Sequence, residues 1–342
     1  MDAIRRSCRQ QTAEHDRVES EFVSRLIGQL PRDRRLEVPP GDDAAVLRPA
    51  ANSRPVVTVD LLTEGVDFLL QGSQTLPAFP PAATPRQVGH KAVAVSLSDL
   101  AAMAAVPEAV VVAVALPRRG GGAIADELTA GIRAITDAYG VTLAGGDTNA
   151  WDGPLVVSVT ALGSVAAGWA WRRDTARVGD LIVVTGPVGG SLLGRHLAVE
   201  ARCREALAIA ERFTVHAAID ISDGLSLDLS RLTTASGVGG VIDLAAVPVH
   251  PDAERLAALQ PAAGKSPLDH ALGDGEDFEL LLTMPADEAI RLVETPPSEL
   301  AAGTSLRPTI IGQIVAEPGL QATTADGRLR PLAAEGFDHA FD

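Results

Sequence analysis

The sequence is poor in the features that would direct it to nucleic acid or to a lipid surface. Its 342 residues carry 29 basic and 44 acidic side chains, a formal net charge of -15 at pH 7. This charge repels nucleic-acid phosphates and anionic lipids, so we expect neither as a partner. Lysine occurs only at positions 91 and 265. A bound phosphate group would therefore have to be held by arginines or by metal ions.

Cysteine and long apolar runs are also scarce. Cys8 and Cys203 cannot build a disulfide framework, and their spacing suits no zinc site, so we expect a reducing, cytoplasmic location. The N-terminus lacks the apolar stretch of a signal peptide, and we expect none. The most apolar run, 109–116, is too short to span a bilayer.

Chain length and composition predict two ordered domains. The chain exceeds one average domain, and 46% of its residues are hydrophobic. Segment 166–180 holds two tryptophans beside arginines, and we interpret it as the connection between the two domains. We therefore predict two domains, an N-terminal one at 1–166 and a C-terminal α/β domain at 167–342.

Strand and helix patterns alternate along both halves, which predicts an α/β or α+β fold with crossover helices. Helices are expected at 14–30, 89–105, 126–139 and 225–235, and strands at 44–47, 56–60, 110–116, 141–144, 155–165 and 181–186. Residues 68–85 read as a loop, and Gly140 as a helix stop. Two Ser-Asp pairs, at 98–99 and 222–223, are each expected to open a helix.

Acidic residues recur beside glycine or serine at expected strand ends and helix starts, where α/β sheets bind ligands. They are Asp42, Asp43, Asp60, Asp99, Asp147, Asp220, Asp223, Glu276 and Asp277. Carboxylates that meet in one cleft repel one another unless cations are bound. Magnesium prefers oxygen ligands and contacts substrate phosphates, so the set predicts magnesium-assisted phosphoryl transfer.

Each acid also has a simpler explanation. Asp223 can cap its helix, Asp60 can end a surface strand, and the pair at 42–43 can form a turn. A purely structural explanation is harder for the Gly-Gly-Asp-Thr sequence at 145–148, because two glycines allow close backbone approach to a ligand. Stretch 273–279 is harder still, because its four acids are costly without a cation or an exposed face.

Several common catalytic and nucleotide-binding motifs are missing. The glycine-rich turn 186–194 lacks the Lys-Ser/Thr ending of a phosphate loop, which favours a structural turn or at most a backbone contact. No serine-nucleophile elbow is present. His90, His196 and His216 have no metal-ligand spacing and are expected to pack or to lie at the surface.

In order, these motifs resemble the thiamine-monophosphate kinase family, in the superfamily of aminoimidazole ribonucleotide synthetase. The matching stretches are 41–46, 58–60, 64–68, 89–103, 145–148, 220–224 and 275–280. The resemblance implies two α/β domains: an N-terminal one at 1–166 that binds ATP and magnesium and forms the dimer, and a C-terminal one at 167–342 that completes the nucleotide and substrate site. A homodimer whose N-terminal strands form a shared barrel is implied as well. It also implies direct in-line transfer of phosphate from ATP to thiamine monophosphate, giving thiamine diphosphate, with several magnesium ions.

The resemblance also assigns individual residues. Implied magnesium ligands are Asp43, Thr58, Asp60, Asp99, Asp147, Asp220 and Asp223. Implied ATP contacts are Gly146, Asp147, Arg173 and Ser222, and implied contacts to thiamine monophosphate are Asp67, Glu276 and Phe337. Asp147, Arg173 and Asp220 are the implied catalytic residues, with the Arg173 guanidinium stabilising charge on the transferred phosphate.

The chain departs from the family at three places. Asp67 stands where the family usually has histidine, Val59 stands where it has a hydroxyl residue, and 196–202 lacks two prolines. Rival hypotheses are an amidine-forming cyclase, a selenophosphate synthetase, or an inactive sensor of nucleotide or thiamine phosphate.

Overall fold

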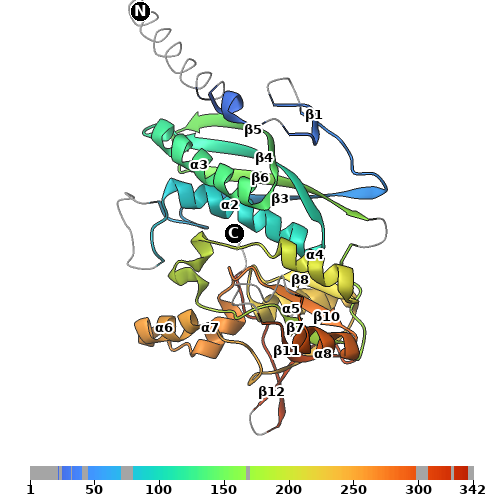
Figure 1. The fold of residues 1–342 in the computed structure, drawn as a ribbon. Helices are drawn as coiled ribbons and strands as arrows, with labels where there is room; N and C mark the ends of the chain where they lie inside the picture. Colours follow the sequence, from blue (N-terminus) through green and yellow to red (C-terminus); the bar gives the residue numbers. More distant parts are fainter. Residues whose placement is uncertain are drawn as a thin grey trace, which may run out of the picture.

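The computed structural model describes residues 22, 25–31, 33–40, 45–70, 80–166, 170–297, 307–324 and 327–337. Figure 1 shows two sheets, one above the other, with a central helix between them. Within the described residues, every helix is too short or too polar to cross a bilayer.

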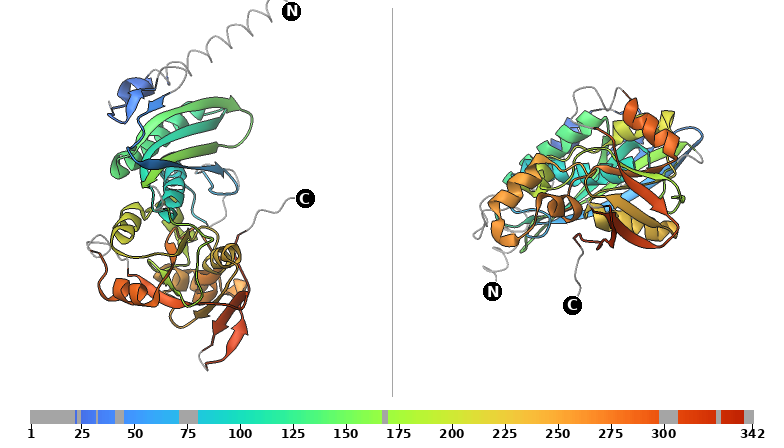
Figure 2. Two further views of the ribbon diagram at one scale, coloured as in Figure 1. Left: turned by 90° about the vertical axis from the view of Figure 1, so that its right-hand side faces the viewer. Right: turned by 90° about the horizontal axis from the view of Figure 1, so that it is seen from below.

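The first sheet has the order β3-β6-β4-β5, in which only β4 and β5 pair in parallel. Its strands are β3 (Ser53–Thr63), β4 (Val106–Pro117), β5 (Thr142–Trp151) and β6 (Val156–Ala166). Helices α2 (Pro85–Ala102) and α3 (Gly121–Tyr139) cover one face (Figure 2). The other face leaves Val57, Val59 and Leu61 of β3 more than 60% exposed. A small pair, β1 (Leu36–Val38) and β2 (Val46–Leu47), precedes this sheet.

The second sheet has seven strands in the order β13-β12-β9-β11-β7-β10-β8. They are β7 (Leu181–Val184), β8 (Ala217–Asp220), β9 (Gly239–Asp243), β10 (Leu280–Met284), β11 (Thr309–Val315), β12 (Gly319–Thr323) and β13 (Leu329–Pro331). Its helices are α4 (Cys203–Arg212), α5 (Leu225–Ser236), α6 (Pro251–Leu259), α7 (Pro267–Gly273) and α8 (Ala286–Glu294). Only the β9–β12 pair is parallel, so the unit is of mixed type.

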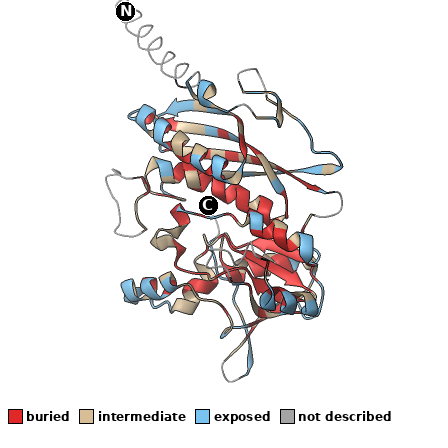
Figure 3. Ribbon diagram, in the orientation of Figure 1, coloured by how far each residue is buried: buried red, intermediate tan, exposed pale blue. Residues whose placement is uncertain are grey.

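Helix α2 joins the two units. It starts at a capping box, in which Thr84 and Gln87 exchange hydrogen bonds, with Pro85 in the first turn. It contacts α3, β3 and β6 of the first unit and α4 and β8 of the second. Figure 3 shows it buried along most of its length. Such all-round burial explains why its sequence is rich in alanine and valine rather than clearly amphipathic.

Most sequence-based assignments agree with this structure. The strands predicted at 56–60, 110–116, 155–165 and 181–186 are confirmed, as are the helices at 89–105, 126–139 and 225–235. Gly140 ends α3 in the left-handed conformation, with φ of 64°. Of the helix predicted at 14–30, residues 25–29 are helical and most of the rest lies outside the described residues.

Two assignments were wrong. Strand β5 continues through Gly145, Gly146 and Asp147 instead of ending before them, because parallel pairing with β4 extends that far. The Ser98-Asp99 pair does not open a helix but lies near the C-terminal end of α2. In both cases tertiary packing outweighed the local sequence signal: β5 continues past two glycines, and α2 continues through the Ser-Asp pair.

The close crossing of α2 and α3 depends on two glycines. A Cβ at Gly131 would lie 2.0 Å from the Arg86 carbonyl oxygen, and one at Gly89 would lie 2.2 Å from that of Leu128. We expect Gly131→Ala to lower the free energy of unfolding by about 1–3 kcal/mol, because the helices must separate.

Urea denaturation measures this effect. The matched control is Gly122→Ala in the same helix, whose added Cβ meets nothing within 4 Å. That control should be neutral or slightly stabilising, since alanine favours a helix. Equal midpoints for the two variants would contradict the close-packing account.

Candidate active site

Three carboxylates from different elements gather where the two units meet. Asp60 comes from β3, Asp99 from α2 and Asp220 from the end of β8. Ser96 and Ser98 of α2 donate hydrogen bonds to Asp60 and Asp220, each at 2.6 Å between oxygens. The Thr58 hydroxyl donates to Asp99. The only side-chain hydrogen bonds that the described structure gives these carboxylates thus come from neutral hydroxyls.

The electrostatics of this cluster favour a bound cation. Burial, followed by repulsion from Asp99, raises the pKa of Asp60 to about 6 and that of Asp220 to about 8. Burial also raises the pKa of Asp99, against the Thr58 hydrogen bond and the charge of Arg173. Three partly desolvated acids with little cationic compensation form an environment that a divalent ion would neutralise.

No three histidine, cysteine or acidic side chains of the described chain stand close enough to hold a metal ion by themselves. An ion bound beside Asp60, Asp99 and Asp220 would therefore need further oxygen ligands. Magnesium commonly takes these from water and substrate phosphates, so the donor set fits that ion. Asp42 and Asp43 lie outside the described residues.

The loop after β8 is held by an acid that the sequence analysis did not single out. One Asp228 carboxylate oxygen accepts hydrogen bonds from the backbone N–H groups of Ser222, Asp223 and Gly224, at 3.0–3.1 Å. Arg231 pairs with both Asp223 and Asp228. The backbone N–H groups of this loop are therefore already bonded within the protein. The signal in the sequence is an acid in the first turn of the helix.

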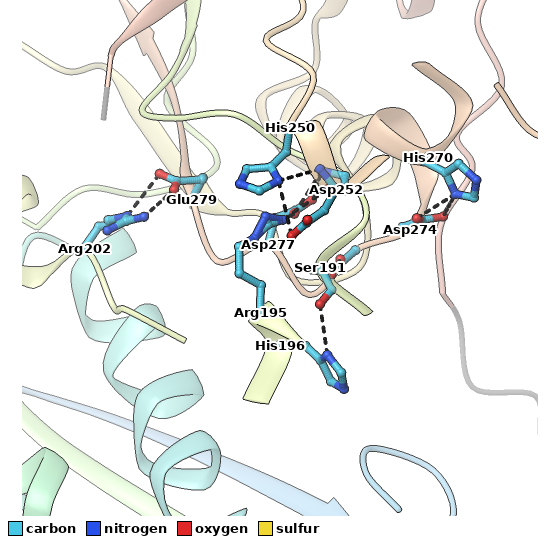
Figure 4. A network of polar contacts seen from close by, with 12 residues as sticks. Ser191, Arg195, His196, Arg202, His250, Asp252, His270, Asp274, Asp277 and Glu279 are labelled. Atoms are coloured by element: carbon cyan, nitrogen blue, oxygen red, sulfur yellow. Dashed lines mark hydrogen bonds and ion pairs between the residues drawn. The ribbon is translucent and has the colours of Figure 1, made fainter. Parts of the chain in front are cut away.

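Each acid of stretch 273–279 has a cationic or potentially cationic side chain as its partner, and Figure 4 shows three of these pairings. Arg195 pairs with buried Asp277 at 2.7 Å, Arg202 pairs with Glu279, and His270 and Lys265 both contact Asp274. Lys91 pairs with Glu276 at 2.7 Å. Side chains of the protein thus partner all four acids, so stretch 273–279 does not need the cations that the sequence analysis expected for its acids.

Glu276 lies in a strained loop beside Ser222. Its φ is 59° and that of Phe278 is 52°, both in the left-handed region that disfavours side chains. The Glu276 N–H donates to the Ser222 carbonyl at 2.7 Å. The Phe337 N–H donates to the Asp223 carbonyl at 2.9 Å, and Phe337 is 50% exposed. Glu276 and Phe337 thus flank the same loop.

Asp67 has a local structural role. Its carboxylate accepts a hydrogen bond from the Thr63 N–H at 2.7 Å and closes the turn after β3. Its negative charge also raises the pKa of Glu276 and of Asp60, although burial contributes more at both. The residue therefore lies near both the carboxylate cluster and the Glu276 loop.

Asp147 and Gly146 lie in β5, apart from the carboxylate cluster. Gly146 aligns across the sheet with Val112, Val159 and Asp60, three strand spacings or about 14 Å away. Since neighbouring residues of a strand point to opposite faces, Asp147 belongs to the open face that carries the exposed valines of β3. Both Gly146 and Asp147 are exposed.

A cavity of about 690 Å³ lies beside this edge strand. Its wall combines apolar side chains of α3, such as Leu128 and Ile132, with β4, N-terminal side chains such as Phe22 and Leu26, and Gly145–Thr148 of β5. An apolar cavity that ends at an exposed Gly-Asp sequence suits a flat ring attached to a charged group.

Comparison with known proteins places these features in a family. Residues 41–165 match the N-terminal domain of AIR synthase related proteins, and residues 177–324 match their C-terminal domain. A thiamine-monophosphate kinase from Rhodopirellula baltica is 37% identical over 94% of this chain and 97% of its own length. The chain belongs to the thiamine-monophosphate kinase family.

Solved structures agree with this membership. The kinase from Stenotrophomonas maltophilia superposes with a TM-score of 0.72 at 32% identity, covering 91% of this chain and 95% of its own. AaThiL, solved in complex with AMPPCP and TMP, gives a TM-score of 0.69 at 26% identity, covering 87% and 91%. The chain is therefore a kinase with the two-domain fold of the AIR synthase related proteins.

The remaining predicted residues are placed as follows. Arg173 is exposed, and its charge reaches Asp99. His90, His196 and His216 bond the Val199 carbonyl, the Ser191 carbonyl and Asp180, so their predicted packing role is confirmed. In turn 186–194, a Cβ at Gly189 would lie 2.6 Å from Ala271 Cα, so tight packing requires glycine there.

The raised pKa values predict how the stability of the metal-free protein depends on pH. A folded-state pKa of about 6 for Asp60 and about 8 for Asp220, against an ordinary 3.8, means that the folded state holds extra protons. Its free energy of unfolding should therefore fall as the pH rises from about 4 to about 8. In Asp220→Asn, this decrease in the free energy of unfolding should be smaller than in the wild type by at least about 1 kcal/mol.

Urea denaturation in the presence of a chelator, at pH 5 and pH 8, measures the effect. Asp152→Asn is the control, because Asp152 is 86% exposed and should keep the wild-type pH dependence. A stability that rises between pH 5 and pH 8 would contradict the electrostatics of the cluster.

Proposed function

We propose that the protein transfers the γ-phosphoryl group of ATP to the phosphate of thiamine monophosphate, which gives thiamine diphosphate. The observation that carries this proposal is the Asp60, Asp99 and Asp220 cluster, which lacks the cationic partners that neutralise the acids of stretch 273–279. A kinase whose acids remain under-neutralised is suited to bind metal ions together with phosphates.

The proposed magnesium ligands are the three clustered acids with Thr58, Asp43 and Asp223, together with Asp147 supplied by a second subunit, because Asp147 of the same chain lies on the opposite face of the sheet. Magnesium would neutralise charge on the phosphates and hold them in line. The family resemblance supports the set, and the pKa shifts of Asp60, Asp99 and Asp220 support its core. In the present conformation Asp223 pairs with Arg231, which would have to share that carboxylate with an ion.

The two ends of ATP fit different surroundings. The apolar cavity beside Gly146 suits the purine ring, while Arg173 and the Ser222 hydroxyl suit the phosphates. Asp147 would act on the phosphates through a magnesium ion. Arg173, exposed and close enough to influence Asp99, can stabilise charge on the transferred phosphoryl group.

The thiamine end is proposed to lie against Glu276, Phe337 and Asp67. A carboxylate and an exposed aromatic ring, both held to the same loop, suit a cationic heterocycle. Asp67 replaces the histidine usual in the family, and its proximity to Glu276 adds negative charge on this side.

An ADP-release assay with ATP, magnesium and thiamine monophosphate tests the function. The wild type should turn over, and Asp99→Asn and Asp147→Asn should each lose about 10²-fold or more in kcat, because each removes a proposed ligand of the ions that hold the reacting phosphates. Asp152→Asn, the exposed control, should keep full activity. Wild-type turnover no higher than that of Asp99→Asn would reject the proposal and leave the inactive-sensor hypothesis.

We further propose a homodimer formed through the open face of the first sheet. Val57, Val59 and Leu61 are exposed there in alternation with inward-facing Thr58 and Asp60. Asp147 belongs to the same face, so a second subunit on this face would cover it and could bring it to the partner's metal site. A stripe of exposed β-branched and leucine side chains favours such an interface.

Light scattering coupled to gel filtration tests the dimer. The wild type should elute with twice the mass of one chain, and Val57→Glu with Leu61→Glu should shift it to one, because two charges per subunit would be buried. The control is Val178→Glu, which is equally exposed outside the sheet. A wild-type mass of one chain would contradict the proposed interface.

A further inference from the structure

Lys91 is a buried cation in a position that packing alone does not explain. It is one of two lysines in the chain, and it is only 1% exposed on the inner face of α2. Removing an ammonium group from water costs several kcal/mol unless it is paired, and an apolar residue of similar volume would fill the same space. A charged residue at this position therefore indicates a function other than filling space.

Its contacts join three segments. The Lys91 Nζ donates to the Asp67 backbone carbonyl at 2.6 Å and lies 2.7 Å from Glu276 Oε2. Asp67 belongs to the turn after β3 in the first unit, and Glu276 belongs to the loop before β10 in the second. One ammonium group thus fixes the distance between the two units at this point.

The ion pair with Lys91 also buries one oxygen of the Glu276 carboxylate. Oε2 is enclosed beside Lys91, whereas the Glu276 side chain as a whole remains 25% exposed. The backbone of Glu276 is held by its hydrogen bond to Ser222 and by its left-handed φ. With Oε2 buried beside Lys91 and the backbone fixed, the part of the Glu276 side chain that remains exposed has a defined direction.

We propose that Lys91 is a positioning residue for the thiamine end of the substrate. It holds the Glu276 carboxylate and the turn that carries Asp67 in one arrangement, so that the exposed part of Glu276 faces the cationic ring. This inference rests on the proposed function, because it takes thiamine monophosphate as the substrate. Lys91 itself contacts neither ATP nor the transferred phosphate.

A double-mutant cycle distinguishes positioning from a purely structural role. The variants are Lys91→Met, which keeps the length of the side chain without its charge, Glu276→Gln, and the two combined. Each is assayed for kcat and for KM of both substrates. Binding of thiamine monophosphate with AMPPCP is measured by calorimetry, and stability by urea denaturation.

If Lys91 acts through Glu276, each single variant should raise KM and Kd for thiamine monophosphate by about tenfold. The double variant should be within about threefold of the worse single variant, because both changes remove the same arrangement. KM for ATP should stay within about twofold. The matched control is Arg202→Met, which removes a buried cation from Glu279 of the same run and should lower stability without a selective change in KM for thiamine monophosphate.

Two results would overturn the inference. One is a KM and Kd for thiamine monophosphate in Lys91→Met within about twofold of wild type, and the other is a double variant whose effects multiply. If Lys91→Met does not fold, Lys91→Arg replaces it, since a guanidinium keeps the charge but shifts Glu276. That variant must still raise KM for thiamine monophosphate selectively.

The wild-type protein separates this test from that of the function. Wild type that neither turns over nor binds thiamine monophosphate rejects both proposals. Wild type that turns over, together with an unaffected Lys91→Met, rejects only the role of Lys91.

Discussion

The structure depends on the burial of one helix between two sheets. Helix α2 contacts the first sheet and α3 on one side, and α4 and β8 on the other. Its alanine and valine side chains allow close approach on every side, so the two units share one core. The polar side chains Lys91, Ser96, Ser98 and Asp99 of α2 lie within this contact. The site follows from that placement, because each of them bonds a residue from another element.

The charges of two groups of buried or half-buried acids are compensated in opposite ways. In stretch 273–279, each acid meets a basic side chain of the protein, and this network fixes the loop that carries Glu276. In the Asp60, Asp99 and Asp220 cluster, hydroxyl groups take the place of cations, and the pKa values of the acids rise. Unbalanced charge of this kind is typical of a site that a ligand completes. The contrast indicates which acids serve structure and which are available to metal ions.

The sequence predicted much of the fold because its signals were local. Gly140 stops α3, and the apolar run 110–116 forms β4, as short-range patterns indicate. The limits came from contacts between distant residues. Pairing with β4 carries β5 past two glycines, and no local pattern shows that Arg195 and Arg202 neutralise acids some 80 residues away. The membership of Asp60, Asp99 and Asp220 in one cluster also needed the fold, whereas the motifs alone pointed to the family. The division of the chain at residue 167 and the individual roles of the site residues stay predictions.

The central claim is that the Asp60, Asp99 and Asp220 cluster holds the metal ions that position the phosphates. Anomalous diffraction from crystals grown with Mn²⁺, AMPPCP and thiamine monophosphate tests it most directly. The account predicts manganese peaks at about 2.0–2.3 Å from oxygens of these carboxylates, bridging to phosphate oxygens. Bound nucleotide with no manganese within reach of any of the three acids would contradict it.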